Sequence, residues 1–400
     1  MAGRDVSTRV LRAIDAERDA LVQLSLAIHA DPEIGYREHN ASRRLSEFLA
    51  ARGFQVERGY CGVDTAYRAD IGGASGPTVA ILAEYDALPD IGHACGHNLI
   101  AMMGTAAAIG VGAVMDEVPG KVAAIGTPAE EGGGGKVALV RAGALEAIDA
   151  AMMVHPSSRT LAGRTSLASN RVDLEFAGRA AHAAAQPDRG INALDGVLQT
   201  FSNVNAMRQQ LRPDARVHGI ISSGGSAANI IPDYAMAKFS VRALDRRYQQ
   251  EVLRRFIACA EGAAMATGTK LTVSIPENSG YENMVPSTPL ARRWAEHMEK
   301  LGVPAAIASE DERMGSTDMG NISQVIPAVH PYISIAQEGT PGHSTAFRDA
   351  AATPEAHESA LRAAKAMALL AVDLLRDPRL LAEARAEFAQ RQAEGVVKGA

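Results

Sequence analysis

Strand patterns alternate with helix patterns through the first half of this chain, and polar residues follow each strand where it ends. Short apolar runs typical of buried strands are separated by Ala- and Gly-rich segments long enough for helices. The expected strands cover residues 78–83, 121–127 and 150–154, and the expected helices cover residues 99–114 and 137–142. This alternation is typical of an α/β fold with a parallel sheet, in which ligands bind at the carboxyl ends of the strands.

The N-terminal segments extend the same unit. Helical spacing of apolar residues predicts one helix over residues 6–30 and a second over residues 38–52. Strands are expected at residues 55–58 and 65–71. The glycine-rich residues 72–77 then predict a hairpin turn into the next strand.

The pattern changes between residues 169 and 276. The order there is strand, helix, strand, strand, helix, strand, which is that of a small ferredoxin-like α+β domain. Helix and strand patterns of the first kind resume after it, and a pair of Ala-rich helices is expected over residues 354–390. We therefore expect an inserted domain at residues 169–283, between the two parts of an α/β domain at residues 1–168 and 284–400.

Composition agrees with two domains and excludes several kinds of partner. A chain of 400 residues exceeds what one hydrophobic core usually supports. The net charge of −6 provides no basic surface for nucleic acid. No apolar run is long enough to span a bilayer, and the polar N-terminus lacks the apolar core of a signal peptide. Three cysteines do not make a disulfide framework, so we expect a protein of the reducing cytoplasm.

Side chains that bind metals follow three of the expected strands. Cys95 and His97 offer a thiolate and an imidazole, which are ligands for zinc and other first-row divalent ions. Glu130 and Glu131 lie between a strand end and a glycine-rich loop, where adjacent carboxylates repel one another unless a cation or proton lies between them. His155 follows the next strand. Because the ends of parallel strands meet at one sheet edge, we expect these groups to share one crevice.

Each of these residues also has a structural explanation. A buried cysteine is common in proteins without a metal, and so are solvated loop glutamates. His155 and His343, the latter in Gly-Thr-Pro-Gly-His-Ser, are singly more typical of structural histidines. The placement of the group at successive strand ends is what favours a metal centre.

Five motifs resemble those of the M20 family of metallopeptidases and amidohydrolases. In chain order they are AEYDALP with CGHN, TPAEEGGGG, VHP, GSTDMGNISQVIPAVHPY and PGHS. The resemblance covers nearly the whole chain. It is closest to the branch that contains one of the two subunits of aminobenzoyl-glutamate hydrolase and the aminoacylase-1-like 2 proteins. It implies an α/β/α catalytic domain, with the inserted α+β domain serving as lid and dimerisation domain.

The resemblance also implies roles for the residues at matching positions. Two divalent ions, zinc or manganese, would be bound by Cys95, which would bridge them, and by His97, Glu131, His155 and His343. Glu130 matches the general base, and Asp86 matches a carboxylate that supports the ligands from behind. Glu84 replaces a metal-binding histidine of many relatives, and Asn98 replaces a carboxylate of other cysteine-containing members. His93 matches no ligand and is expected to be structural.

In the inserted domain, three residues match positions that act on the substrate. His182 resembles a histidine that reaches the partner subunit's site in a homodimer and stabilises the oxyanion. Asn229 and Arg242 match positions that bind the substrate's carboxylate. From the residues alone, structural roles are more typical of all three. His182 would pack a loop, Asn229 would suit a turn before Pro232, and Arg242 would pair with Asp245 or lie solvated on a strand.

The implied reaction is metal-assisted hydrolysis of an amide. Glu130 would take a proton from water and later protonate the leaving amine. The resemblance favours N-acyl amino acids or dipeptide-like substrates such as aminobenzoyl-glutamate, and it does not select among them.

Three alternatives remain. Ser344, in Gly-His-Ser-Thr-Ala, resembles the nucleophile of a serine hydrolase, although the last glycine of that motif is Ala346. Lys136 follows a glycine run as in a phosphate-binding loop, but the first glycine of that motif is Glu130 and no Ser or Thr follows the lysine. A non-catalytic protein of the same fold, serving binding or assembly, is the third alternative.

Overall fold

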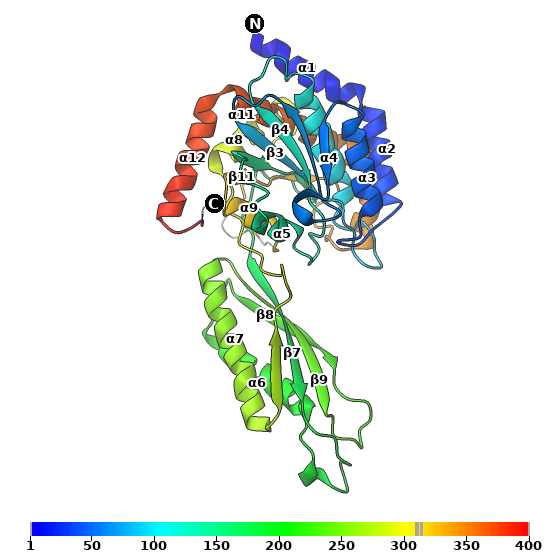
Figure 1. Cartoon of the computed structure of the whole chain (residues 1–400), viewed down its shortest axis with the longest axis vertical. Helices are drawn as coiled ribbons and strands as arrows, with labels where there is room; N and C mark the ends of the chain where they lie inside the picture. Colours follow the sequence, from blue (N-terminus) through cyan, green and yellow to red (C-terminus); the bar gives the residue numbers. More distant parts are fainter. Residues whose placement is uncertain (1, 309–311, 313–314, 399–400) are drawn as a thin grey trace. The chain divides into compact units, whose positions relative to one another are not determined.

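The computed structural model describes residues 2–308, 312 and 315–398, with side chains from residue 6 onward (Figure 1). The chain forms two compact units. The larger comprises Met1–Thr165, Met284–Arg313 and Asp318–Ala400, and the smaller comprises Ser166–Asn283 and Met314–Thr317. The smaller unit is therefore inserted into the sequence of the larger one.

A six-stranded sheet forms the centre of the larger unit, in the order β1-β2-β4-β3-β5-β11. Its strands are β1 (Gln55–Arg58), β2 (Tyr67–Gly72), β3 (Thr78–Ala83), β4 (Lys121–Gly126), β5 (Ala150–Met152) and β11 (Ala328–Val329). β3 is parallel to β4 and to β5, and β11 is parallel to β5. β1 and β2 run antiparallel at one edge. β6 (His155–Ser157) and β12 (Tyr332–Ser334) form a short parallel pair.

The hairpin predicted at residues 72–77 is wrong. β4 lies between β2 and β3, so the two strands are not paired with each other. The connection instead passes the start of β4, where Gly73 donates to the carbonyl of Gly120 at 2.9 Å and Gly120 donates to that of Ser75 at 2.8 Å. A Cβ atom on Gly76 would lie 2.7 Å from the nitrogen of Gly120. The glycines therefore permit a close passage of two backbones, and a local turn signal does not reveal which strand pairs with which.

The helices of the larger unit surround this sheet. They are α1 (Ala2–Ala16), α2 (Arg18–His29), α3 (His39–Ala50), α4 (His97–Gly112), α5 (Gly135–Arg141), α8 (Thr288–Lys300), α9 (Met319–Ser323), α10 (Thr345–Ala350), α11 (Pro354–Arg376) and α12 (Pro378–Ala393), with a short 3₁₀ turn at Tyr60–Gly62. The α4 helix is buried over almost its whole length and packs against β3 and β4. Gly104 of α4 approaches Ala83 so closely that a Cβ there would lie 3.0 Å from the alanine side chain.

The single helix predicted over residues 6–30 is two helices. The chain leaves helical geometry at Glu17, whose φ and ψ are −96° and 1°. The side chain of Glu17 pairs there with Arg52 of the segment after α3. Val10 and Ile14 of α1 and Leu21 of α2 are fully buried on either side of the break, so the apolar spacing continues through it and gives no sign of the break.

The smaller unit has a four-stranded antiparallel sheet in the order β10-β7-β9-β8. Its elements are β7 (Ala168–Ala177), α6 (Ala193–Met207), β8 (Arg216–Ser223), β9 (Tyr234–Ala243), α7 (Arg246–Thr267) and β10 (Lys270–Ser274), with 3₁₀ turns at Pro187–Arg189 and Arg208–Gln210. Both helices pack on the sheet around Phe176, Phe239 and Phe256. This is the predicted ferredoxin-like arrangement.

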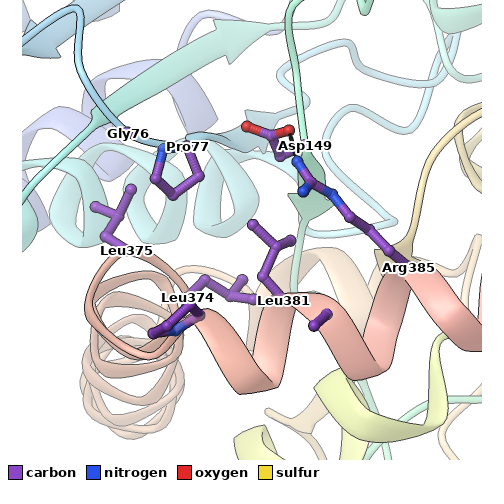
Figure 2. A pocket seen from close by; sticks show the side chains of 9 residues that line it. Gly76, Pro77, Asp149, Leu374, Leu375, Leu381 and Arg385 are labelled. Carbon is purple, nitrogen blue, oxygen red and sulfur yellow. Dashed lines mark hydrogen bonds and ion pairs between the residues drawn. The ribbon is translucent and has the colours of Figure 1, made fainter.

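A cavity of about 400 Å³ opens where α11 meets α12 (Figure 2). Leu374, Leu375 and Leu381 line it, and Arg385 pairs with Asp149 at its rim. Asp149 directly precedes β5 and accepts a hydrogen bond from the first residue of β3. The cavity therefore lies at the amino ends of these strands, away from the edge where the polar cluster was expected. No helix among the described residues is long and apolar enough to cross a membrane.

Candidate metal centre

The carboxyl ends of β3, β4 and β5 bring the predicted metal-binding residues together. Asp86 follows β3, the pair Glu130–Glu131 follows β4, and His155 begins β6 directly after β5. His97 is the first residue of α4, which packs on the same strands. The expected convergence at one sheet edge is therefore present in the structure.

Cys95 is shared by two groups of possible ligands. It lies with His97 and His155 in one group, and with Glu131 and His343 in the other. In each group one ligand atom from every residue lies within 4.8 Å of the others. A sulfur shared between two such groups has the placement of a ligand that bridges two ions.

Asp86 fixes two of these residues from behind. Its Oδ1 atom accepts a hydrogen bond from Nδ1 of His97 at 3.0 Å, and its backbone carbonyl accepts from the same nitrogen at 2.9 Å. Its Oδ2 atom accepts from the backbone N–H of Glu131 at 2.9 Å. Carboxylates that orient a ligating histidine in this way are typical of metal sites.

His97 and His155 present the same nitrogen to the centre. Nδ1 of His97 faces only acceptors on Asp86, and Nδ1 of His155 lies 2.6 Å from the carbonyl oxygen of Pro156. Each Nδ1 therefore donates a proton, so Nε2 is the ring nitrogen that each histidine could offer to a metal ion. Burial lowers the pKa of His155 to about 3, so this ring is neutral at physiological pH, as a metal ligand must be.

His343 reaches the centre from the C-terminal part of the chain. Its Nε2 atom lies 3.5 Å from Oε1 of Glu131, and its backbone N–H donates to the carbonyl of Ala94 at 3.0 Å. Its φ of 58° is in the left-handed region, which is uncommon for a residue other than glycine. The side chain is 59% exposed, so this candidate ligand lies at the solvent side of the group.

Glu130 lies beside the candidate ligands and has a strongly perturbed pKa. Burial, followed by the charges of Glu84, Glu131 and Asp318, raises the pKa of Glu130 well above its usual range. Ala129, directly before it, has a φ of 58° and is held by a 2.8 Å hydrogen bond to Glu38. A carboxyl with a raised pKa next to a metal centre has the properties of a general acid–base group.

Sequence reasoning missed a buried ion triad next to this centre. The Lys136 ammonium lies 2.5 Å from Oε1 of Glu84 and 2.7 Å from Oδ1 of Asp318, and all three side chains are fully buried. Burial acts to raise the pKa of Glu84, but the charge of Lys136 outweighs it and holds that pKa at about 2. Burial raises the pKa of Asp318 to about 6, and the nearby charge of Glu84 adds to this increase, although Lys136 acts to lower it.

The triad also removes the phosphate-loop alternative. Lys136 points into the protein and is engaged by Glu84 and Asp318, so it is not available to a phosphate. The sequence contains one signal that points to this burial. Lys136 is followed by the apolar run Val-Ala-Leu-Val, and a lone lysine on an apolar helix requires acidic partners.

The donor set fits a cation. Among the described residues, Oε2 of Glu84, Nε2 of His97 and Oε1 of Glu131 are buried atoms without a hydrogen-bond partner. Buried polar atoms are normally satisfied, and these three are all electron-pair donors. Burial raises the pKa of the Cys95 thiol, so a nearby cation is needed to ionise it. Thiolate, imidazole and carboxylate together are a ligand set for zinc or another first-row divalent ion.

Two residues near the cluster have structural contacts. His93 is buried, belongs to none of the ligand groups found among the described residues, and places Nε2 3.1 Å from the carbonyl of Ile28. Asn98 donates to Ser25 at 2.9 Å and to the carbonyl of Ala351 at 3.0 Å. Asn98 thus joins α4 to α2 and to the segment before α11.

The smaller unit holds the three residues that were expected to act on the substrate. His182 is exposed, and its Nδ1 accepts from the backbone N–H groups of Ala184 and Ala185. The carbonyl of Asn229 accepts from Ala183, so the loops of His182 and Asn229 lie side by side. Arg242 donates from Nε to Ser240 at 3.0 Å and from its guanidinium to the hydroxyl of Ser316 at 3.5 Å.

Ser344 does not have the geometry of a serine nucleophile. Its Oγ atom donates to the carbonyl of Pro341 at 2.7 Å and accepts from the N–H of Phe347, which caps the N-terminus of α10. Its φ is −125°, and the strained left-handed conformation of a nucleophile elbow falls on His343 instead.

Comparison with known proteins agrees with this arrangement. Residues 80–368 match the model of peptidase family M20/M25/M40. The chain is 40% identical over 398 residues to the Xaa-Arg dipeptidase of Mus musculus, with 95% of this chain and 91% of that protein covered. It is 28% identical over 453 residues to a subunit of the p-aminobenzoyl-glutamate hydrolase of Escherichia coli strain K12, with 94% of each covered.

A solved structure shares the fold. The Bacillus subtilis YXEP protein, a dinuclear metal binding peptidase from the M20 family, superposes with a TM-score of 0.66 at 20% identity. The match covers 90% of this chain and 99% of that one. The predicted fold class, an α/β catalytic domain with an inserted α+β domain, is confirmed.

Proposed function

Because the chain belongs to peptidase family M20/M25/M40 and is thus a hydrolase of amide bonds, we propose that it cleaves dipeptides or N-acyl amino acids at a two-metal centre. The observation that carries the proposal is the position of Cys95. It belongs to two ligand groups, one with His97 and His155 and one with Glu131 and His343. That sharing is what a pair of ions bridged by one thiolate requires.

Zinc or manganese would be held by Cys95, His97, Glu131, His155 and His343. Bound divalent ions supply a Lewis acid for the scissile carbonyl and lower the pKa of the attacking water. The thiolate favours zinc, because soft ligands select zinc over manganese. The resemblance to cysteine-containing relatives keeps manganese as the second choice.

Glu130 is the residue to which we assign the proton transfers. It lies within 4.8 Å of the ligand atoms of His97 and Glu131, so it can reach a water that they help to position. Its raised pKa suits a group that must accept a proton and release it within one catalytic cycle. It would take the proton of the attacking water and deliver it to the leaving amine.

The smaller unit is assigned to substrate binding and to a homodimer. His182 would stabilise the oxyanion in the partner subunit's site. Asn229 and Arg242 would bind the carboxylate of the substrate, for which a guanidinium and an amide are suitable donors. With Cys61, Cys95 and Cys259 free, we place the protein in the reducing cytoplasm.

For the substrate we propose a dipeptide with a C-terminal arginine, and an aminobenzoyl-glutamate-like amide as the second candidate. The first rests on the 40% identity to the mouse Xaa-Arg dipeptidase, and the second on the 28% identity to the bacterial hydrolase. Both classes carry a free carboxylate next to the scissile amide, so both suit the roles given to Asn229 and Arg242.

The test is a reconstitution experiment. The purified protein is stripped with a chelator, reloaded with zinc or with manganese, and assayed against Xaa-Arg dipeptides, p-aminobenzoyl-glutamate and a panel of N-acyl amino acids. We expect the stripped protein to be inactive and metal to restore hydrolysis. Activity that survives complete removal of metal, or a metal-loaded protein that cleaves no member of the panel, would contradict the proposal.

A further inference from the structure

Lys136 is a fully buried cation that no role assigned so far explains. Its ammonium contacts Oε1 of Glu84 at 2.5 Å and Oδ1 of Asp318 at 2.7 Å. Its backbone N–H also donates to Oδ2 of Asp318 at 2.9 Å. A buried charge is tolerated only when it is paired and hydrogen-bonded, so the contacts of Lys136 define where Glu84 and Asp318 must lie.

The triad joins three parts of the chain that meet at the metal centre. Glu84 follows β3, Lys136 lies in the first turn of α5 just after the loop of Glu130 and Glu131, and Asp318 precedes α9. The contacts span 52 residues from Lys136 to Glu84 and 182 residues from Lys136 to Asp318. One ammonium thus fixes the loop after β3 relative to the loop after β4.

The second oxygen of Glu84 faces the ligand His97. Oε2 of Glu84 lies 3.4 Å from Nε2 of His97, both side chains have no exposed surface, and neither atom has a hydrogen-bond partner. Because Nδ1 of His97 is engaged by Asp86, Nε2 is the ring nitrogen left to face a metal ion. A carboxylate oxygen and an imidazole nitrogen at this distance, without hydrogen bonds in a dry interior, are placed so that one cation could contact both.

We propose that Lys136 is a positioning residue of the metal centre. By engaging Oε1 of Glu84, it directs Oε2 toward the side of the centre that His97 faces, and it makes Glu84 an additional acidic residue of that centre. The inference rests on the proposed function, since it requires metal ions in the centre. It assigns to Glu84 and Lys136 a role that the five proposed ligands do not include.

A purely structural role for the triad makes a different prediction. If Lys136 only joined loops, its loss would lower the stability of the protein without acting through Glu84. If Lys136 acts through Glu84, the effects of changing the two residues on metal affinity are not additive, because the second change removes a function already lost.

The experiment measures metal affinity by chelator competition in the full-length protein. The variants are Lys136→Met, Glu84→Gln and the double variant, and Lys121→Met is the control. Lys121 also pairs with an aspartate, Asp70, but at the far end of β4. The ligand field is read from the visible spectrum of the protein reloaded with cobalt, which does not depend on turnover.

We expect each single variant to weaken metal binding about 10- to 100-fold and to change the cobalt spectrum, as is usual for residues that support ligands. The double variant should bind no more weakly than Glu84→Gln alone, and Lys121→Met should match the wild type. Unchanged affinity and spectrum in Lys136→Met, or losses that multiply in the double variant, overturn the inference.

Two further readouts keep the outcomes separate. Glu84→Gln keeps the shape of the side chain, so it tests the inference even if Lys136→Met does not fold. An unchanged metal affinity and cobalt spectrum in Glu84→Gln would refute the role of Glu84. Metal binding by the wild-type protein tests the proposed function separately, because a wild-type protein that binds no metal would refute the metal centre itself. A wild type that binds metal together with an insensitive Glu84→Gln refutes only the further inference.

Discussion

The carboxylate of Asp86 holds Nδ1 of His97 at 3.0 Å, and its other oxygen holds the backbone of Glu131 at 2.9 Å. One side chain after β3 therefore fixes a residue at the start of α4 and a residue after β4. Asp86 is the acceptor in both hydrogen bonds, so its side chain must be correctly placed for either candidate ligand to be oriented.

Asp86→Asn is expected to weaken metal binding about 10- to 100-fold, the usual cost of losing a group that orients ligands. The amide cannot accept on both sides, because one of its two ends becomes a donor that faces the N–H of His97 or of Glu131. Metal affinity by chelator competition measures the effect. Asp70→Asn on β2 is the matched control, and equal affinities in the two variants would show that Asp86 does not orient the ligands.

Glu130→Gln is expected to retain both ions and to lower kcat about 10²- to 10⁴-fold, the range for loss of a general base. Glutamine keeps the shape of the side chain but cannot take a proton from water. Elemental analysis gives the metal content and steady-state kinetics give the rate. Wild-type turnover in a fully loaded Glu130→Gln protein would falsify the assignment.

Cys95→Ser is expected to bind less metal than the wild type, because a serine hydroxyl is a far poorer bridging ligand than a thiolate. Since Cys95 belongs to both ligand groups, the loss should affect both ions and not one alone. Elemental analysis after dialysis measures it, with Cys259→Ser in the smaller unit as control. A Cys95→Ser protein with the metal content of the control would exclude the bridging position.

The sequence patterns predicted the strand-end cluster because its chemistry is local. His155 directly follows an apolar run, and Glu130 and Glu131 follow another, so periodicity and residue type are enough to place them. His343 is distant in the chain from the strand-end cluster, and only the family resemblance predicted that it belongs to the same metal site. Its 3.5 Å approach to Glu131 is a tertiary contact that no spacing encodes.

The features that were missed or mistaken depend on distant pairing. The glycines at residues 72–77 signal a close turn, but β4, which the chain reaches only later, takes the place beside β2. Lys136 was considered only as part of a phosphate loop, because its partners Glu84 and Asp318 lie 52 and 182 residues away. The sequence can indicate that a buried charged residue needs a partner of opposite charge, but it does not indicate which residue that partner is.

Ser344→Ala is expected to leave hydrolysis close to the wild-type level and to lower stability by about 1 kcal/mol, as is usual for a lost N-terminal cap. The hydroxyl caps α10 by accepting from Phe347. Turnover and thermal unfolding are measured on the same samples, with a serine-reactive probe added to the wild type. Loss of activity together with labelling of Ser344 would restore the serine hydrolase alternative.

Glu38 is a buried acid that links α3 to the loop of the metal centre. Its two oxygens accept from the backbone of Ala129 at 2.8 Å and from the hydroxyl of Thr65 at 2.9 Å. Burial, together with the nearby charge of Asp86, raises the pKa of Glu38 from 4.5 to about 7. The folded protein therefore retains a proton on Glu38 that the unfolded chain releases between these two values.

Folding stability should accordingly fall as the pH rises from 4.5 to 7, because the folded state binds more protons than the unfolded state over that interval. The shift corresponds to about 3 kcal/mol of folding free energy, which is present at low pH and is fully lost above pH 7.

Glu38→Gln removes this pH-dependent loss of stability. The variant can keep both contacts, since its amide oxygen accepts from Ala129 and its NH₂ group can donate to the Thr65 hydroxyl. Urea unfolding of metal-free protein at several pH values measures the effect. Between pH 4.5 and 7.5 the free energy of unfolding of Glu38→Gln should rise relative to that of the wild type. The free energy of unfolding of Glu57→Gln, a change at an exposed residue, should have the same pH dependence as that of the wild type. A constant difference between Glu38→Gln and the wild type across that range would mean that Glu38 is ionised in the folded protein throughout.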